Sequence, residues 1–269
     1  MQRLSACASR RPRPGSPDSA HLHAGAKVAR VNTLSALWRV LPWIDWAALA
    51  LFFAVWAAYA RFAQVRAAVQ PSLLAMTNRE RTRWMVQTTW RDNRVVDGVV
   101  LQSLSASPSF FASTTILIIG GLLAVLSTTE KASEFVQEIP FAARTSLLVF
   151  DLKVVLLLAV FIYAFFRFTW SLRQYTFGAL LVAAAPAHDR FTGDAQRQAF
   201  AQRAGRVMGL AAETFNDGLR AYYFSFAGVA WFFSPWAMMA GTAAVVFILY
   251  RREFHSDVLA VLRSDGPVP

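Results

Sequence analysis

The sequence predicts an all-α protein, a polytopic bundle of transmembrane helices with five spans, or four in an alternative interpretation. Hydrophobic residues make up 56% of the chain, and the mean hydropathy is +0.38. Phe110–Leu126 has no charge in 17 residues, and Ala221–Tyr250 has none in 30. Because about 20 helical residues cross the ~30 Å hydrocarbon core of a bilayer, such runs favour membrane spans over a soluble core.

The first three spans are expected at about 44–60, 109–126 and 147–166. Trp43 precedes the first span and Trp56 lies near its end, as is typical of the two membrane interfaces. Between the first and second spans, Asn78–Leu104 is expected to form one helix on the membrane surface. Pro108 is then expected to begin the next helix, because proline fits a first helical turn.

The apolar run Ala221–Tyr250 is too long for one span, because 30 helical residues measure about 45 Å. Ser234-Pro235 interrupts its middle, and proline is unfavourable inside a helix. We therefore predict a hairpin of two spans, at about 213–233 and 236–250. One helix kinked at the proline, which would give four spans in all, is the alternative.

Residues 1–39 are expected to form a disordered basic extension, before a transmembrane domain at 40–262 and a short C-terminal tail at 263–269. The net charge is +11, and the extension contributes +6 through seven basic residues and one acid. Its Pro, Ser, Arg and Gly content is typical of disorder, and a translation start downstream of it is one interpretation. Because no aromatic residue separates its clustered arginines, we expect no nucleic-acid partner.

The distribution of basic residues predicts the orientation, because basic loops favour the cytoplasmic side of a membrane. Segments 61–107 and 167–220 each carry seven Arg or Lys, whereas 127–146 carries two, with three acids. We therefore expect the first two segments inside and the third outside, in the inner (plasma) membrane of a bacterial cell. The lipid bilayer is the expected partner, with anionic lipids held by cytoplasmic arginines.

The strongest candidate site is a polar stripe of four residues: Glu213, Asn216, Asp217 and Arg220. Their separations of three, four and seven residues place them on one helical face. An arginine this close to hydrocarbon is expected to need partners, and Arg220 can reach Asp217 and Asn216. One interpretation is an ion cluster that anchors the span at the interface, and the other is a polar cytoplasmic vestibule.

Asp92, Arg94 and Asp97 are weaker candidates. The two aspartates resemble the acidic metal motifs of membrane phosphotransferases, but positions five residues apart lie about 140° apart on a helix. They are therefore not expected to converge, and Asp97 is expected to pair with Arg94 or Asn93 instead. A structural salt bridge is the favoured interpretation, and a metal or catalytic acid is the alternative.

Asp151 and Lys153 are charges inside the third span, and such charges are functional candidates by default. Both are placed about one turn inside the outer boundary when positions are counted back from Arg167. Lys153 is expected to snorkel outward, and Asp151 to benefit from the positive end of the helix dipole. The alternative is a gating or substrate contact.

No catalytic, cofactor or metal signature is present in the sequence. The patterns G-x-x-x-x-G-K-[ST], H-E-x-x-H and G-x-S-x-G are all missing. Cys7 is the only cysteine, so no intrachain disulfide can form. We therefore expect no catalytic residue, no cofactor and no metal site.

Five stretches of the sequence are distinctive together: Arg91–Asp97, Phe110–Thr115, Tyr163–Ser171, Phe215–Phe224 and Tyr250–Phe254. In these stretches the chain resembles the membrane family catalogued as domain of unknown function 599, found in bacteria and plants. The resemblance covers roughly 43–262 and leaves 1–39 outside. It implies a polytopic membrane protein and carries no established activity.

The favoured function is non-enzymatic: a small-solute or ion pathway, or a membrane assembly factor. It follows from polar residues inside the membrane without catalytic apparatus. The alternative is a membrane-bound enzyme that acts on lipid head groups at the cytoplasmic face. In that case four arginines would hold the phosphate: Arg91, Arg94, Arg173 and Arg220.

Overall fold

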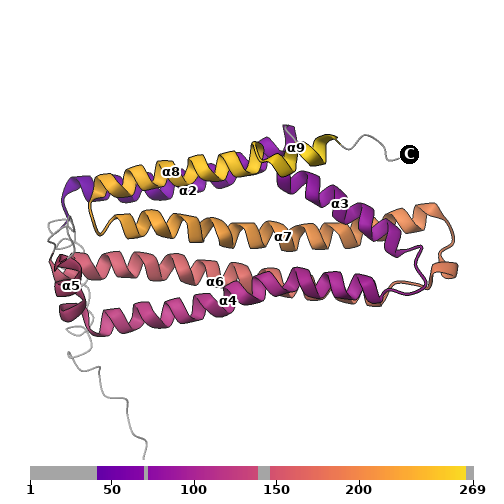
Figure 1. Cartoon of the computed structure of the whole chain (residues 1–269), viewed down its shortest axis with the longest axis horizontal. Coiled ribbons are helices and arrows are strands. Elements are labelled where there is room, and N and C mark those ends of the chain that lie inside the picture. Colours follow the sequence, from indigo (N-terminus) through magenta and orange to yellow (C-terminus); the bar gives the residue numbers. More distant parts are fainter. Residues whose placement is uncertain (1–40, 70–71, 139–145, 265–269) are drawn as a thin grey trace, which may run out of the picture. The chain divides into compact units, whose positions relative to one another are not determined.

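The computed structural model describes residues 41–69, 72–138 and 146–264, and every regular element among them is a helix (Figure 1). The predicted all-α class is therefore confirmed. The chain divides into two units, 1–43 and 44–269; the predicted extension at 1–39 lies outside the described residues. The elements are α2 (Trp43–Val69), α3 (Leu73–Thr88), α4 (Val95–Ser127), α5 (Thr129–Glu138), α6 (Leu147–Ala183), η1 (His188–Arg190), α7 (Asp194–Ala230), α8 (Pro235–Phe254) and α9 (Asp257–Ser264).

Among the residues that the structure describes, three helices are long and apolar enough to cross a membrane: Trp43–Ala63 within α2, Val95–Ser127 and Leu147–Ala183. They contain the first three predicted spans but are longer. Helix α6 has 37 residues, which is about 55 Å and exceeds the ~30 Å hydrocarbon core. The same helices therefore also build a part of the bundle outside the predicted spans.

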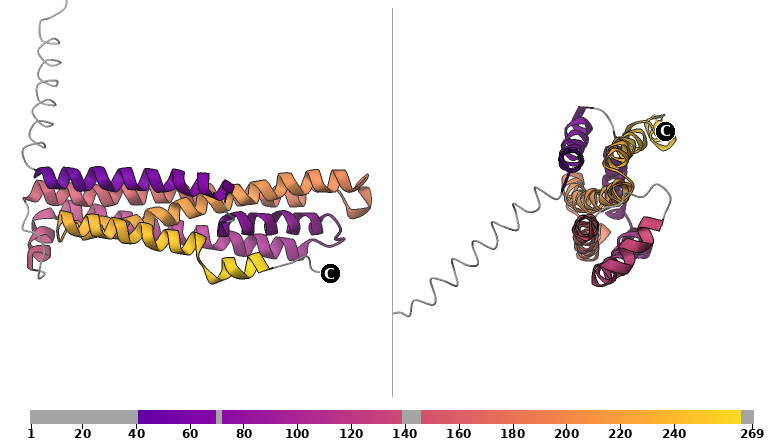
Figure 2. Two further views of the ribbon diagram at one scale, coloured as in Figure 1. Left: turned by 90° about the horizontal axis from the view of Figure 1, so that it is seen from above. Right: turned by 90° about the vertical axis from the view of Figure 1, so that its left-hand side faces the viewer.

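Within residues 44–264, α4, α6 and α7 run between two ends of the bundle. The α3–α4 turn and η1 lie at one, here called the α3 end, and α5 lies at the other, the α5 end, which α2 and α8 share (Figure 1). Helices α6 and α7 pack side by side, with α4 against α6 and α8 against α7 (Figure 2). Glycines permit this closeness, since a Cβ on Gly218 would lie 2.5 Å from the Phe168 ring.

The prediction of one helix over Asn78–Leu104 is wrong, because a turn at 89–94 separates α3 from α4. The Asn93 side chain accepts the Val95 N–H at 2.9 Å and so supports the start of α4. No proline or glycine lies in this turn, so the strongest sequence signals of a break are missing, and only Asp92-Asn93 indicates one. What holds the turn is a set of contacts with other helices, described below.

Helix α4 continues through Pro108, which was expected to begin a helix and instead lies inside one. Proline lacks the N–H that would bond to the carbonyl of Leu104, one turn earlier. Helices in apolar surroundings tolerate such prolines when neighbouring groups compensate. The predicted span 109–126 is therefore the second half of a longer helix.

The final apolar run forms a helical hairpin rather than one kinked helix, since the chain reverses direction between α7 and α8 (Figure 1). Ser234 Oγ accepts the Ala237 N–H at 3.0 Å and caps α8. Pro235 occupies the first turn, where its missing N–H would have had no helical partner. The helices approach closely, because a Cβ on Gly241 would lie 3.4 Å from Cα of Ala227.

Helix α2 meets the bundle mainly through aromatic rings. The ring centroid of Phe224 on α7 lies 5.5 Å from that of Phe52 and 5.1 Å from that of Trp56. Trp56 also contacts Tyr163 on α6, at 5.6 Å. These four residues, called here the aromatic layer, join α2, α6 and α7.

At the α3 end, four helices enclose an apolar core outside the predicted spans. Residues from α3, α4, α6 and α7 contribute to it, among them Met85, Leu101, Tyr175, Phe200 and Met208. The N-terminal half of α7 is thereby held against α3, which positions the polar stripe of α7 beside it.

Candidate functional site

A polar cavity of about 500 Å³ lies among α2, α3, α6, α7 and α8 and is called here the central cavity. Three arginines and three carboxylates dominate its lining. The lining residues are Ala63, Ser72, Leu74, Ala75, Asn78, Arg167, Arg206, Leu210, Glu213, Thr214, Asp217, Arg220 and Glu253.

The central cavity collects three of the four residues of the predicted stripe: Glu213, Asp217 and Arg220. Asn216 instead lines a side cavity of about 130 Å³, which shares Arg220 and Glu253 with the central one. The four residues therefore lie on one helix, α7, as the spacing predicts. Glu213 and Asp217 line the central cavity, Asn216 lines the side cavity, and Arg220 lines both.

Asp217 is held by two arginines from different helices. Arg220 Nη1 donates to Asp217 Oδ1 at 3.0 Å, the pairing expected from the sequence. Arg167 Nη2, on α6, donates to Oδ2 of the same carboxylate. Within the described chain, the structure records no hydrogen bond between Asn216 and Arg220, so that expected contact is not found.

The triad Arg167–Asp217–Arg220 carries one positive charge in excess. Each guanidinium has five N–H donors, and each places one on Asp217. Arg167 Nε is buried and finds no hydrogen-bond partner among the described residues. The Arg220 side chain is 11% exposed and that of Asp217 22% exposed, so solvent screens the charge only in part. The unused donors suit carboxylate or phosphate oxygens.

The other carboxylates of the central cavity are also engaged. Glu213 Oε1 accepts from Arg206 Nη1 at 2.8 Å and from Asn78 Nδ2 at 3.3 Å. Glu253, on α8, accepts the backbone N–H of Leu74 at 3.4 Å. These bonds tie α3 to α7 and α8, so α3 forms one wall of the cavity.

The side cavity adds two further arginines, Arg81 and Arg252. Burial lowers the pKa of Arg81, and the nearby Tyr175 and Glu213 oppose that shift. Arg252 Nη1 donates to the Tyr223 hydroxyl oxygen at 2.8 Å. The two cavities together thus hold five arginines against three carboxylates; the surplus comes from the side cavity, because the central cavity by itself has three of each.

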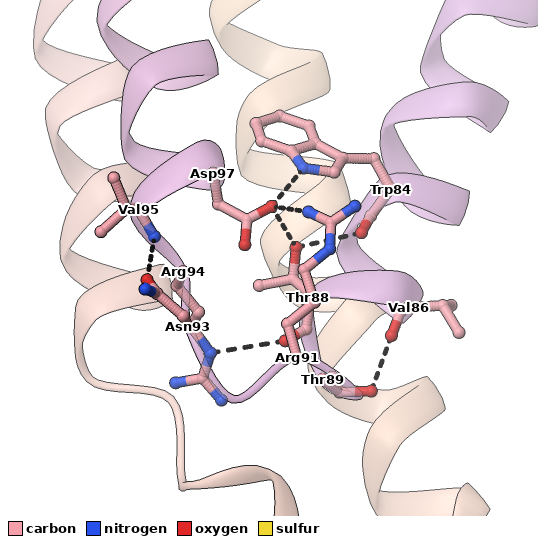
Figure 3. A network of polar contacts seen from close by, with 9 residues as sticks. All are labelled: Trp84, Val86, Thr88, Thr89, Arg91, Asn93, Arg94, Val95 and Asp97. Carbon is pink, nitrogen blue, oxygen red and sulfur yellow. Dashed lines mark hydrogen bonds and ion pairs between the residues drawn. The ribbon is translucent and has the colours of Figure 1, made fainter.

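Asp97 lies at the α3 end, in a separate polar network (Figure 3). It is fully buried, and its Oδ1 accepts from Trp84 Nε1 at 2.7 Å and Thr88 Oγ1 at 3.1 Å. Arg91 also donates to this oxygen. The bonds from Trp84 and Thr88 therefore join the end of α3 to the start of α4, and the ion pair with Arg91 ties the turn to α4.

The predicted partners of Asp97, Arg94 and Asn93, are wrong. Both lie in the turn rather than on a helix, so helical spacing does not apply to them. Arg94 instead donates to the carbonyl of Ala185 at 2.8 Å and to that of Pro186. Arg94 thus links the α3–α4 turn to the segment between α6 and η1.

Arg197, on α7, makes a second link to the same turn. It donates to the carbonyls of Thr89 and His188, the latter at 2.7 Å, and its guanidinium lies 3.7 Å from the Trp90 ring centroid. Asp92 pairs with His188 at 2.5 Å on the surface. Asp92 and Asp97 therefore serve different contacts, but the helical spacing behind that prediction does not apply, because Asp92 lies in the turn.

Lys153 is 2% exposed, so the prediction that it snorkels outward is wrong. Its ammonium lies 5.6 Å from the ring centroid of Trp231 and 5.7 Å from that of Phe232. The turn between α7 and α8 supplies both rings and covers the lysine. Asp151 accepts from Thr129 Oγ1 at 2.8 Å, which ties α6 to α5.

Sequence reasoning missed the site residues that lie away from the stripe: Asn78, Arg167, Arg206 and Glu253. Of these four residues, only Arg167 stands out in the sequence, because it is the charged residue that ends the apolar run beginning at Leu147. Within the described ranges, no group of three His, Cys, Asp or Glu side chains is placed to hold a metal ion. The site is therefore an arginine-rich cavity formed by five helices.

The chain belongs to the family described as protein of unknown function, DUF599, whose model matches residues 47–258. This match covers most of the chain and confirms the resemblance drawn from the sequence. Comparison with curated proteins and with solved structures gave no match.

Proposed function

We propose that the chain is a five-span membrane protein of the bacterial inner membrane. The spans would be α2, the second half of α4, the first half of α6, the second half of α7, and α8. The helical hairpin at Ser234-Pro235 supports two spans in the final apolar run, and it brings Arg251-Arg252 toward the α3 end. The positive-inside rule then makes the α3 end cytoplasmic and the α5 end external.

The central cavity would be a solute-binding vestibule open to the cytoplasmic side, in a non-enzymatic protein. The observation that carries this proposal is the gathering of three arginines and three carboxylates around about 500 Å³, beside the ends of the proposed spans that the positive-inside rule assigns to the cytoplasm. Charged groups at such depth are costly and are retained where they serve a ligand or an ion path.

The aromatic layer supports a closed binding site rather than an open channel. Trp56 precedes the cavity residue Ala63 by two helical turns, and Phe224 follows Asp217 by two turns. Tyr163 precedes Arg167 by one turn. All three rings therefore lie toward the α5 end from the cavity, where they pack on one another and separate it from the external side.

Cysteine accessibility tests the vestibule. In a Cys7→Ser background, Ala75→Cys places one thiol in the cavity wall, and Leu117→Cys places one on an exposed apolar face of α4 as the control. A membrane-impermeant thiol reagent should label Ala75→Cys in inside-out vesicles and not in right-side-out vesicles. Leu117→Cys should stay unlabelled in both. Labelling of Ala75→Cys from the external side would overturn the proposal.

The lipid head-group enzyme receives less support from the geometry. Arg91 and Arg94 hold the α3–α4 turn, and Arg173 lies on a groove of α6 outside the central cavity. Only Arg220 of the four expected phosphate ligands lines that cavity. Lipid profiles of a deletion strain distinguish the two functions. An altered head-group pattern favours the enzyme, and an unchanged pattern favours the vestibule.

A further inference from the structure

We propose that the ligand of the central cavity is the phosphate of an anionic phospholipid, which reaches Arg167 from the lipid-facing side of α6. This inference rests on the proposed vestibule and names the class of molecule that it takes.

Arg167 is the link between the inside of the bundle and its surface. It lines the central cavity and also a groove on α6, of about 570 Å³. The groove is formed by Tyr163, Phe166, Arg167, Thr169, Trp170 and Arg173. The Arg167 side chain therefore borders both spaces, so a head group in the groove would lie beside a residue whose guanidinium is anchored to Asp217 inside the bundle.

The electrostatics favour an anion at this position. Asp217 neutralises only one of the two guanidiniums that it contacts, and Arg173 adds a further positive charge at the groove. Arg167 Nε is buried and has no partner in the described part of the chain. A phosphate oxygen would have to meet the other N–H groups of this guanidinium, and arginine binds phosphate through paired N–H groups.

The walls of the groove favour a lipid over a free anion. Phe166 is 63% exposed, Trp170 49% and Tyr163 42%, so apolar ring surface lies directly beside the two arginines. Tryptophan and tyrosine prefer the level of the head groups in a bilayer. An acyl chain can cover these rings while the phosphate meets Arg167, whereas inorganic phosphate would leave them uncovered.

The test measures the thermal unfolding midpoint of the purified full chain in a neutral detergent. Phosphatidylglycerol, phosphatidylcholine and inorganic phosphate are titrated separately, at equal phosphate concentrations. Phosphatidylglycerol should raise the midpoint of the wild type, and inorganic phosphate should not. Arg167→Gln should need about tenfold more phosphatidylglycerol for the same effect, the loss expected for one charge-assisted contact. Arg203→Gln, an exposed arginine of α7 outside both cavities, should respond like the wild type.

A second variant keeps the proposal testable if Arg167→Gln fails to fold. Trp170→Ala leaves the triad intact and should also weaken the phosphatidylglycerol response, by about tenfold for the lost ring surface. A wild-type response of Arg167→Gln overturns the lipid inference, and so does an equal effect of inorganic phosphate. Either result leaves the vestibule standing, because cysteine labelling tests it independently. A phosphatidylcholine response equal to that of phosphatidylglycerol would likewise refute recognition of an anionic lipid.

Discussion

Removing the charge of Asp217 should destabilise the protein more than removing the charge of Arg220. From the sequence alone, loss of Arg220 would leave Asp217 unpaired. In the structure Asp217 also binds Arg167, so it keeps one partner when Arg220 is lost. Loss of the carboxylate instead leaves two arginines facing each other without a counter-charge.

The magnitudes follow from the partial burial of the triad. Hydrogen bonds to charged groups contribute about 1.5–3 kcal/mol each, so Arg220→Gln should cost about 1.5 kcal/mol. Breaking a buried pair by removing one partner costs about 3–5 kcal/mol. Because Asp217 is 22% exposed, the lower value of about 3 kcal/mol is expected for Asp217→Asn. The double variant should cost less than the sum, by about 1 kcal/mol, since Arg220→Gln then removes an unpaired charge.

Unfolding in detergent, followed by tryptophan fluorescence, measures these differences. At roughly 2–4 °C per kcal/mol for a chain of this size, Asp217→Asn should lower the midpoint by about 6–12 °C and Arg220→Gln by about half as much. Arg203→Gln on the same helix serves as the control and should leave the midpoint unchanged. Equal losses for the two single variants, or strict additivity in the double variant, would refute the shared carboxylate.

Three further predictions concern the rest of the molecule. Asp97→Ala should cost about 3–5 kcal/mol in denaturant unfolding, because it leaves Arg91 and Trp84 without their common acceptor; a change below about 1 kcal/mol would contradict the network. Gly205→Ala should destabilise by about 1–3 kcal/mol, since its Cβ would lie 2.9 Å from the Thr82 backbone. Gly98→Ala, where a Cβ meets no atom within 4 Å, should be neutral or stabilise by up to about 1 kcal/mol; similar melting of the two glycine variants would refute the tight α3–α7 contact. Reporter fusions after Glu138 should report the external side and those after Arg190 and Phe254 the cytoplasmic side; an external result after Phe254 would remove the fifth span.

The sequence by itself determined the class of the protein and the face of α7 that carries the stripe. Long runs without charge require apolar surroundings, and residues three and four apart share a helical face whatever surrounds the helix. The break at Ser234-Pro235 was readable for the same reason, because a cap and a first-turn proline act locally. The pairing of Arg220 with Asp217 lies within one helical turn, so it too needed no tertiary information.

Only the tertiary structure decided which distant residues meet those local patterns. Arg167 and Glu253 reach the cavity from α6 and α8, and no periodicity in the stripe points to them. The turn at 89–94 is held by Arg94, which donates to the carbonyl of Ala185, and by Arg197, which donates to that of Thr89, contacts that span about a hundred positions of the chain. Lys153 is covered by rings from a turn that comes nearly eighty residues later. Packing between helices therefore fixes the partners that a charge finds on other helices, whereas the local sequence fixes only those within one helical turn.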